Sequence, residues 1–212
     1  MAAMRLGSIM LIAGLSLGCV TPVQVEMPGD PQARAPRKLA LMPFSLGTQL
    51  TAAQLEETKP DFVSEVVTAR VLESLVLWTG FEIVPPAEVS RVLVAGGPLD
   101  SPGTPAEIGA RLAASFGVDA VLFGRVDRFV PRIGSGRGAS RPAAVRFRLE
   151  LRADDGAVIW VGTYDEVQRS FLEDPGSLQR AMKRGFRWVT VERLVQYGAE
   201  ELVRRLPDGS WR

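Results

Sequence analysis

The stretch from Val118 to Val126 is apolar on both faces for several consecutive residues. A strand of this composition is buried on both sides, as in a sheet that helices cover on two faces. The segment Val145–Arg152 instead alternates strictly between apolar and charged residues, which predicts a strand with one face in the core and one in water. The two segments together predict an α/β chain in which helices pack on a sheet.

Four helices are predicted around these strands. Apolar residues recur at three-to-four spacing from Asp61 to Trp78, and a second helix begins at Pro86, because proline is tolerated in a first turn. The sequence Thr104–Glu107 has the spacing of a capping box and opens a third helix. Thr190 is the expected N-cap of the last helix.

The remaining strands complete the predicted order. Further strands are expected at 38–44, 81–84 and 157–164, and the last one follows a tight turn at Asp154–Gly156. The predicted order is β-α-β-α-α-β-β-β-α, and a short additional helix near 178–183 stays open. This is an α+β arrangement with a mixed sheet, and we expect residues 37–212 to form a single domain.

An apolar run of thirteen residues, Leu6 to Gly18, precedes Cys19, which is the only cysteine. The run is too short to cross a hydrocarbon core, which needs about 20 residues. One basic residue, an apolar stretch and a small residue at the end are typical of a cleaved export signal. We therefore expect residues 1–18 to be a signal peptide, although an ordinary secretory signal or a short membrane anchor stays an alternative to a lipoprotein signal.

The segment Leu15–Cys19 resembles the lipobox of bacterial lipoproteins, with Ser16 at a place where leucine is usual. This resemblance implies that Cys19 is the lipid attachment site and the first residue of the mature chain, anchored by acyl chains such as palmitate. Residues 19–36 carry four prolines and no periodicity, which predicts an extended tether. The alternative is that part of this tether docks on the domain as an edge strand.

The chain contains no histidine, which excludes histidine bases, Ser-His-Asp triads and histidine metal ligands. The carboxylate pairs at Glu56–Glu57 and Asp154–Asp155 are interpreted as solvated charge. We therefore expect no catalytic residue, no cofactor and no metal site. Loss of Arg5 with the signal balances basic and acidic residues, so a nucleic-acid partner is not expected.

Arginines are concentrated between Arg125 and Arg152, where only Asp127 and Glu150 oppose them. A solvated strand face accounts for about half of them. The others lie in a Gly/Arg-rich connection, residues 131–142, and are candidate contacts for anionic lipid headgroups or an acidic partner: Arg132, Arg137 and Arg141. The alternative is an exposed hairpin whose charges are merely solvated.

Four segments carry a resemblance to a family: Leu39–Phe44, Gly80–Val84, Phe116–Val126 and Asp155–Trp160. They resemble the envelope lipoproteins of the group that includes CsgG, LpoB and the N-terminal domain of TolB. The resemblance implies a periplasmic α/β domain without enzymatic activity. Because members share a fold and differ in task, the fold does not select among functions.

The function expected from this resemblance is a noncatalytic scaffold or assembly factor for another envelope protein. An LpoB-like activator of a peptidoglycan synthase and a CsgG-like ring-forming secretion component are the alternatives, and self-association stays open. A pore of the CsgG type needs two additional hairpins per subunit, whereas one is predicted here. Val20, in place of an aspartate after the cysteine, resembles the sorting signal for the outer membrane.

Overall fold

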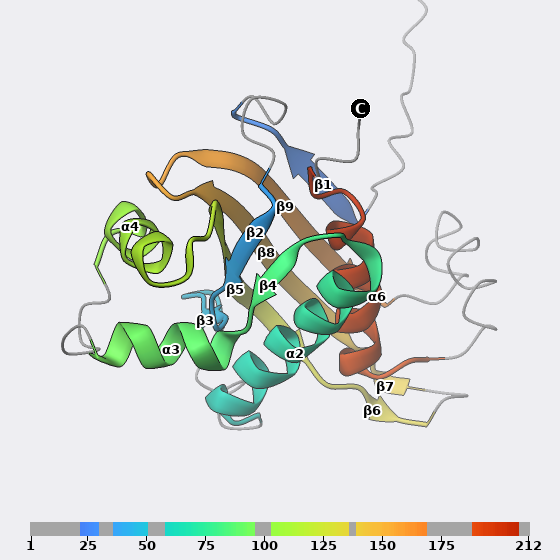
Figure 1. The fold of residues 1–212 in the computed structure, drawn as a ribbon. Coiled ribbons are helices and arrows are strands. Elements are labelled where there is room, and N and C mark those ends of the chain that lie inside the picture. The colour runs from blue at the N-terminus through green and yellow to red at the C-terminus, as the bar shows by residue number, and fades with distance from the viewer. Residues whose placement is uncertain are drawn as a thin grey trace, which may run out of the picture.

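The computed structural model describes residues 22–29, 36–50, 58–95, 103–135, 139–168 and 188–207. These residues build a seven-stranded mixed sheet with helices packed on it, which confirms the predicted fold class. The strands lie in the order β1-β9-β8-β5-β2-β4, and β3 pairs with β5 (Figure 1).

The strands of the main sheet are β1 (Val23–Glu26), β2 (Lys38–Leu41), β3 (Ser45–Leu46), β4 (Glu82–Val84), β5 (Ala120–Val130), β8 (Ala144–Ala153) and β9 (Val158–Val167). A separate two-stranded hairpin consists of β6 (Ile133–Gly134) and β7 (Ala139–Arg141). The helices are α2 (Pro60–Trp78), α3 (Pro86–Ala95), α4 (Pro105–Phe116) and α6 (Val191–Val203).

The sheet has a parallel part and an antiparallel part that meet at β5. β2 is parallel to both β4 and β5, and the connections between these strands contain helices, as parallel strands require. β5, β8 and β9 form an antiparallel meander, and β1 adds antiparallel to the outer side of β9. The turn between β8 and β9 contains Gly156 at a φ of 86°, where a side chain would be strained.

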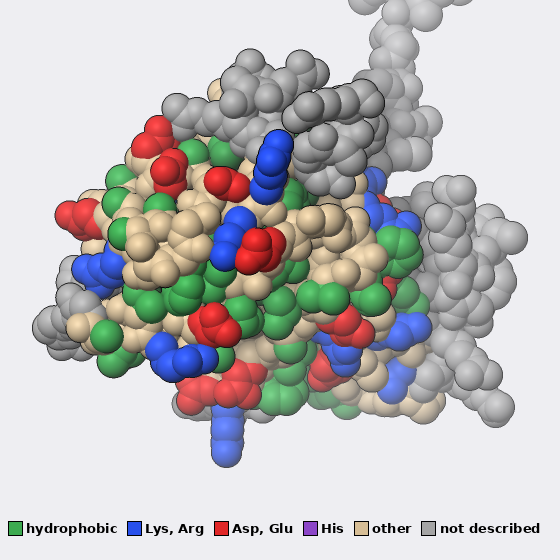
Figure 2. All heavy atoms as spheres, viewed as in Figure 1, with side chains coloured by type: hydrophobic (Ala, Val, Ile, Leu, Met, Phe, Trp, Pro, Cys, Tyr) green, Lys and Arg blue, Asp and Glu red, His purple; other side chains and the backbone are tan. Residues whose placement is uncertain are grey.

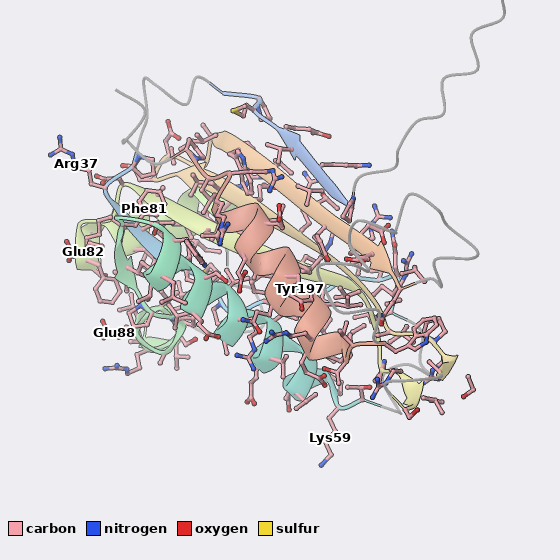
Figure 3. All side chains as sticks on the ribbon, turned by 90° about the vertical axis from the view of Figure 1, so that its right-hand side faces the viewer. Arg37, Lys59, Phe81, Glu82, Glu88 and Tyr197 are labelled. Carbon is pink, nitrogen blue, oxygen red and sulfur yellow. The ribbon has the colours of Figure 1, made fainter. Side chains whose placement is uncertain are left out.

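Helices cover the two faces of the sheet in pairs. Side chains alternate between faces along a strand, so Leu39 and Leu41 point to one side of β2 and Ala40 to the other. The first side belongs to the larger hydrophobic cluster, together with residues of α2 and α6, which lie side by side on the sheet (Figures 1 and 3). The second side packs with α3 and α4 in a smaller cluster.

The helix pair α2 and α6 leaves its outer surface to solvent. Lys59, at the start of α2, and Tyr197, on α6, are labelled in Figure 3, where Lys59 points away from the fold. At the other end of the two helices, the guanidinium of Arg204 lies 3.7 Å from the centre of the Trp78 ring. This cation–π contact joins the C-terminal ends of the two helices.

Residues 19–36 differ in part from the expected tether. Val23–Glu26 form the edge strand β1, whose residues pair with Tyr164 to Val161 of β9. The alternative of a docked edge strand is therefore the one that the structure supports for these four residues. Apolar side chains explain the docking, because Val23 and Val25 pack against the larger hydrophobic cluster. The short helix considered near 178–183 lies outside the described residues.

The capping box predicted at the start of α4 is present. The side chain of Thr104 accepts a hydrogen bond from the Glu107 backbone N–H, and the Glu107 carboxylate accepts one from the Thr104 backbone N–H at 2.7 Å. The hydrogen bond from the Thr104 backbone holds the pKa of Glu107 below its ordinary value. The charged carboxylate therefore stabilises the folded state.

This cap predicts a pH-dependent difference between the wild type and Glu107→Gln. Since the pKa is lower in the folded chain, the stabilisation is fully present above the pKa of the unfolded carboxyl group and is lost as the pH falls through the folded pKa. Urea unfolding at a series of pH values should show a wild-type advantage at neutral pH that disappears in acid. A difference that stays constant with pH would contradict this role of the carboxylate.

Candidate functional site

The predicted site residues are only partly described by the structure. Cys19 and Arg137 lie outside the described residues. Arg132 donates a hydrogen bond to the carbonyl of Trp188 at 2.5 Å, and the Nε of Arg141 donates to the carbonyl of Pro131 at 3.3 Å. Both side chains thus help to hold the β6–β7 hairpin in place. Their contact with headgroups or a partner stays a prediction.

The structure gathers four other arginines on one face of the sheet. In the register of β5 and β8, two pairs of arginines stand directly opposite each other, and we call this set the arginine quartet: Arg125 opposite Arg148 and Arg128 opposite Arg146. Residues opposite each other in an antiparallel pair share a face, with Cβ atoms about 4.5–5.5 Å apart. Like charges in these positions destabilise a sheet unless anions lie nearby.

Carboxylates of the same sheet supply part of the required negative charge. The ion pairs are Arg128–Asp165 at 2.9 Å, Arg146–Asp165 at 3.4 Å, Arg125–Asp127 at 2.9 Å and Arg148–Glu150 at 3.4 Å. Asp165 therefore serves two members of the quartet, and Glu150 is shared with Arg152. The side chains of the quartet remain partly exposed, so solvent or another anion can still reach them.

The quartet lies on the face of the sheet opposite α2 and α6. Its neighbours along β8, Phe147 and Leu149, point the other way and belong to the larger hydrophobic cluster. Among the described residues, the cluster beneath α3 and α4 contains none from β8 or β9. The helices α3 and α4 therefore cover this face over β2, β4 and the first part of β5, and the quartet lies beyond them.

The charge on this face changes along the strands. Glu150 on β8 and Glu26 on β1 both pair with Val161 of β9. On the same face of the sheet, Glu150 lies two residues along β8 from Arg148, which pairs with Arg125. The turn at the same far end of β8 and β9 contains Asp154 and Asp155. The face is therefore basic at the end where β1 begins and acidic toward the other end.

The quartet is a site that the sequence analysis did not single out. The sequence shows that these arginines alternate with apolar residues, which predicts the solvated face but not the strand beside it. Only the register of β5 against β8 reveals that arginine stands opposite arginine. The bulge between Val126 and Arg128 is part of this register, because it brings Arg128 onto the same face as Arg125.

A buried polar pair lies on the opposite side of β9. The hydroxyl of Tyr164 donates a hydrogen bond to the carboxylate of Glu166, and both side chains are buried. Nearby, the side-chain oxygen of Gln168 accepts a hydrogen bond from the Val189 backbone N–H at 3.0 Å. These contacts join the end of β9 to the segment that leads into α6, and they are interpreted as structural.

Tyr164→Phe is expected to lower the free energy of unfolding by about 1–3 kcal/mol, because it removes a hydrogen-bond donor from a buried carboxylate. Tyr197→Phe is the matched control, since the Tyr197 hydroxyl accepts a hydrogen bond from Arg193 in an exposed position. Urea unfolding of both variants gives the comparison. Equal losses for the two tyrosines would show that the buried pair adds nothing specific.

The described part of the chain holds neither a metal-binding cluster nor a helix that could span a membrane. Within it, histidine, cysteine, aspartate and glutamate form no group of three or more suited to a metal ion. None of the helices described in the structure has the length and apolar character needed to cross a membrane.

Exposed apolar side chains gather over the helices. Figure 2 shows them as a broken band with charged side chains on either side. The large exposed members on the helices are Phe62, Val76, Leu77 and Trp78 of α2 and Val94 of α3. This band and the arginine quartet are thus separate surfaces.

Comparison with known proteins gives likenesses in three dimensions only. No family model matches the chain, and no curated protein matches it in sequence. The PelC dodecamer from Paraburkholderia phytofirmans is 13% identical, with a TM-score of 0.46 over 88% of this chain and 99% of that chain.

Two other solved structures are similar in the same way. Lipoprotein GNA1162 from Neisseria meningitidis is 19% identical, with a TM-score of 0.38 over 71% of this chain and 94% of that chain. The LpoB C-terminal domain from Escherichia coli is 18% identical, with a TM-score of 0.33 over 63% of this chain and 85% of that chain. Likenesses at these identities and scores do not bear on function.

Proposed function

We propose that the protein is a lipoprotein anchored in the bacterial outer membrane, whose periplasmic domain is a noncatalytic scaffold or assembly factor for another envelope protein. The observation that carries this proposal is the run from Leu6 to Gly18 that ends at Cys19. An export signal that ends in a small residue directly before a single cysteine supports a lipid anchor at the start of the mature chain. Several acyl chains then make the attachment stable.

The position of β1 bears on the choice among envelope roles. An activator that reaches through the peptidoglycan needs a long flexible linker, whereas β1 begins at Val23, four residues after Cys19. Because β1 docks on β9, most of the proline-rich segment cannot extend the domain away from the membrane. This arrangement supports a scaffold that works close to its membrane over an LpoB-like activator.

Crosslinking in intact cells, followed by mass spectrometry, tests the scaffold role. The wild type should fractionate with the outer membrane and crosslink to a different envelope protein. Cys19→Ser should lose both the membrane fraction and that crosslink. The particle mass in detergent is measured in parallel. A large ring built only of copies of this chain would contradict the scaffold role and support a ring-forming secretion component. Hydrolase activity of the purified protein would contradict a noncatalytic role.

A further inference from the structure

The start of the described chain is fixed to the row of the sheet that carries half of the arginine quartet. The backbone N–H of Asp165 donates a hydrogen bond to the carbonyl of Pro22 at 2.8 Å. The side chain of the same Asp165 pairs with Arg128 and Arg146. Pro22 is therefore hydrogen-bonded to the residue whose carboxylate binds two guanidinium groups of the quartet.

The sequence then limits how far the anchor can lie from this row. Cys19 is three residues before Pro22. An extended chain spans at most about 3.3–3.6 Å per residue, so the two Cα atoms are at most about 11 Å apart. A lipid on Cys19 thus holds the Pro22 end of the sheet at the membrane surface.

Charge complementarity identifies what this end of the sheet meets. The four arginines of the quartet stand in two like-charge pairs, and a single carboxylate, Asp165, serves two of them. The acidic residues Glu26 and Glu150 lie in a row farther from Pro22 on the same face. A face that is basic beside the anchor and acidic away from it fits a negatively charged surface at the anchor end.

We propose that the arginine quartet rests on the anionic phospholipid headgroups of the membrane that holds Cys19. This inference builds on the proposed function, because it needs the lipid on Cys19. The headgroup phosphates add to the negative charge of Asp127, Glu150 and Asp165, which are three carboxylates against five arginines, the quartet and Arg152. The contact orients the domain, so that the quartet face lies toward the membrane and the exposed apolar side chains of α2 lie on the side away from it.

The test uses the native lipidated protein in vesicles and reads which face lies at the membrane. Because lipid occupies the sulfur of Cys19, one introduced cysteine takes a fluorophore without competition. Thr163→Cys places it on the quartet face, since Thr163 stands opposite Arg148. Glu65→Cys on α2 places it in an exposed position on the other side of the sheet and is the control. A quencher attached to the lipid headgroup reports proximity.

In vesicles that contain phosphatidylglycerol, the label at 163 should be quenched much more strongly than the label at 65. High salt, or pure phosphatidylcholine, should abolish this difference, because the attraction is between charges. Arg125→Gln together with Arg148→Gln should lower the ratio of docked to undocked protein by about 25-fold, since each arginine near an anionic surface contributes about fivefold. Arg70→Gln with Arg193→Gln removes the same charge from α2 and α6, on the other side of the sheet, and should change the ratio little.

Each outcome decides the inference. Quenching that is equal at the two positions, or that does not respond to salt and lipid charge, overturns it without the arginine variants. Incorporation of labelled palmitate into the same preparation is checked first. A protein that carries palmitate but shows no preferred face contradicts only the headgroup contact, whereas a protein without palmitate contradicts the proposed function itself.

Discussion

Trp160→Ala is expected to lower the free energy of unfolding by about 3–5 kcal/mol. Trp160 is fully buried in the larger hydrophobic cluster. Its ring covers Gly162, where even a Cβ atom would clash with it, and Leu202 of α6 reaches the same place. Alanine would leave a cavity between β9 and α6, and single domains have only about 5–15 kcal/mol of stability to lose.

Urea unfolding followed by circular dichroism measures this loss as a shift of the midpoint at constant slope. Trp78→Ala is the matched control, because Trp78 is 47% exposed and its ring lies against Arg204. Its loss should stay near the value of an exposed cation–π contact, about 0.5–1 kcal/mol. Trp160→Phe should cost less than alanine, since it refills much of the space and removes an indole N–H that finds no hydrogen-bond partner among the described residues. Equal losses at positions 160 and 78 would contradict the packing described here.

Gly198→Val is expected to destabilise the fold by about 1–3 kcal/mol or more, because the helix α6 approaches the sheet at this glycine. A Cβ atom at Gly198 would lie 2.5 Å from Cδ1 of Tyr164 and 2.8 Å from Cε1 of Phe147. Both rings are fully buried and form an aromatic pair with centroids 5.7 Å apart, so neither has room to move. The helix would have to lift from β8 and β9.

Gly80→Val is the control for Gly198→Val. A Cβ atom at Gly80 meets nothing within 4 Å in the described part of the chain, and the residue lies just before β4. The two variants add the same side chain, so a difference between their unfolding midpoints reports the close approach of α6. A midpoint for Gly198→Val as high as that of Gly80→Val would show that α6 does not sit on Tyr164 in this way.

Local patterns of the sequence predict most of the elements. The alternation in Val145–Arg152 and the apolar run Val118–Val126 identify β8 and β5, although β5 continues to Val130. The capping box marks the start of α4. β1 stays open in the sequence because its four residues, Val23–Glu26, alternate apolar and polar over only a short stretch between prolines. Their pairing depends on the free edge of β9, which local sequence does not show.

The candidate site depends on register, and register is a property of two strands together. The arginines of the quartet are visible in the sequence as a solvated face, but a shift of β8 by one residue against β5 would place none of them opposite another. Arg132 and Arg141 are the expected site residues because they lie close together in sequence in a Gly/Arg-rich segment. In the structure, both side chains instead donate hydrogen bonds to backbone carbonyls.

Labelling with radioactive palmitate tests the lipid anchor most directly. The label should enter the wild-type protein in growing cells and be absent from Cys19→Ser, which retains the rest of the export signal. The wild type should also be recovered in the membrane fraction. Cys19 is the only cysteine of the sequence, so no other thiol can carry the label. Equal labelling of the two proteins, or an unlabelled wild type that keeps residues 1–18, would contradict the account.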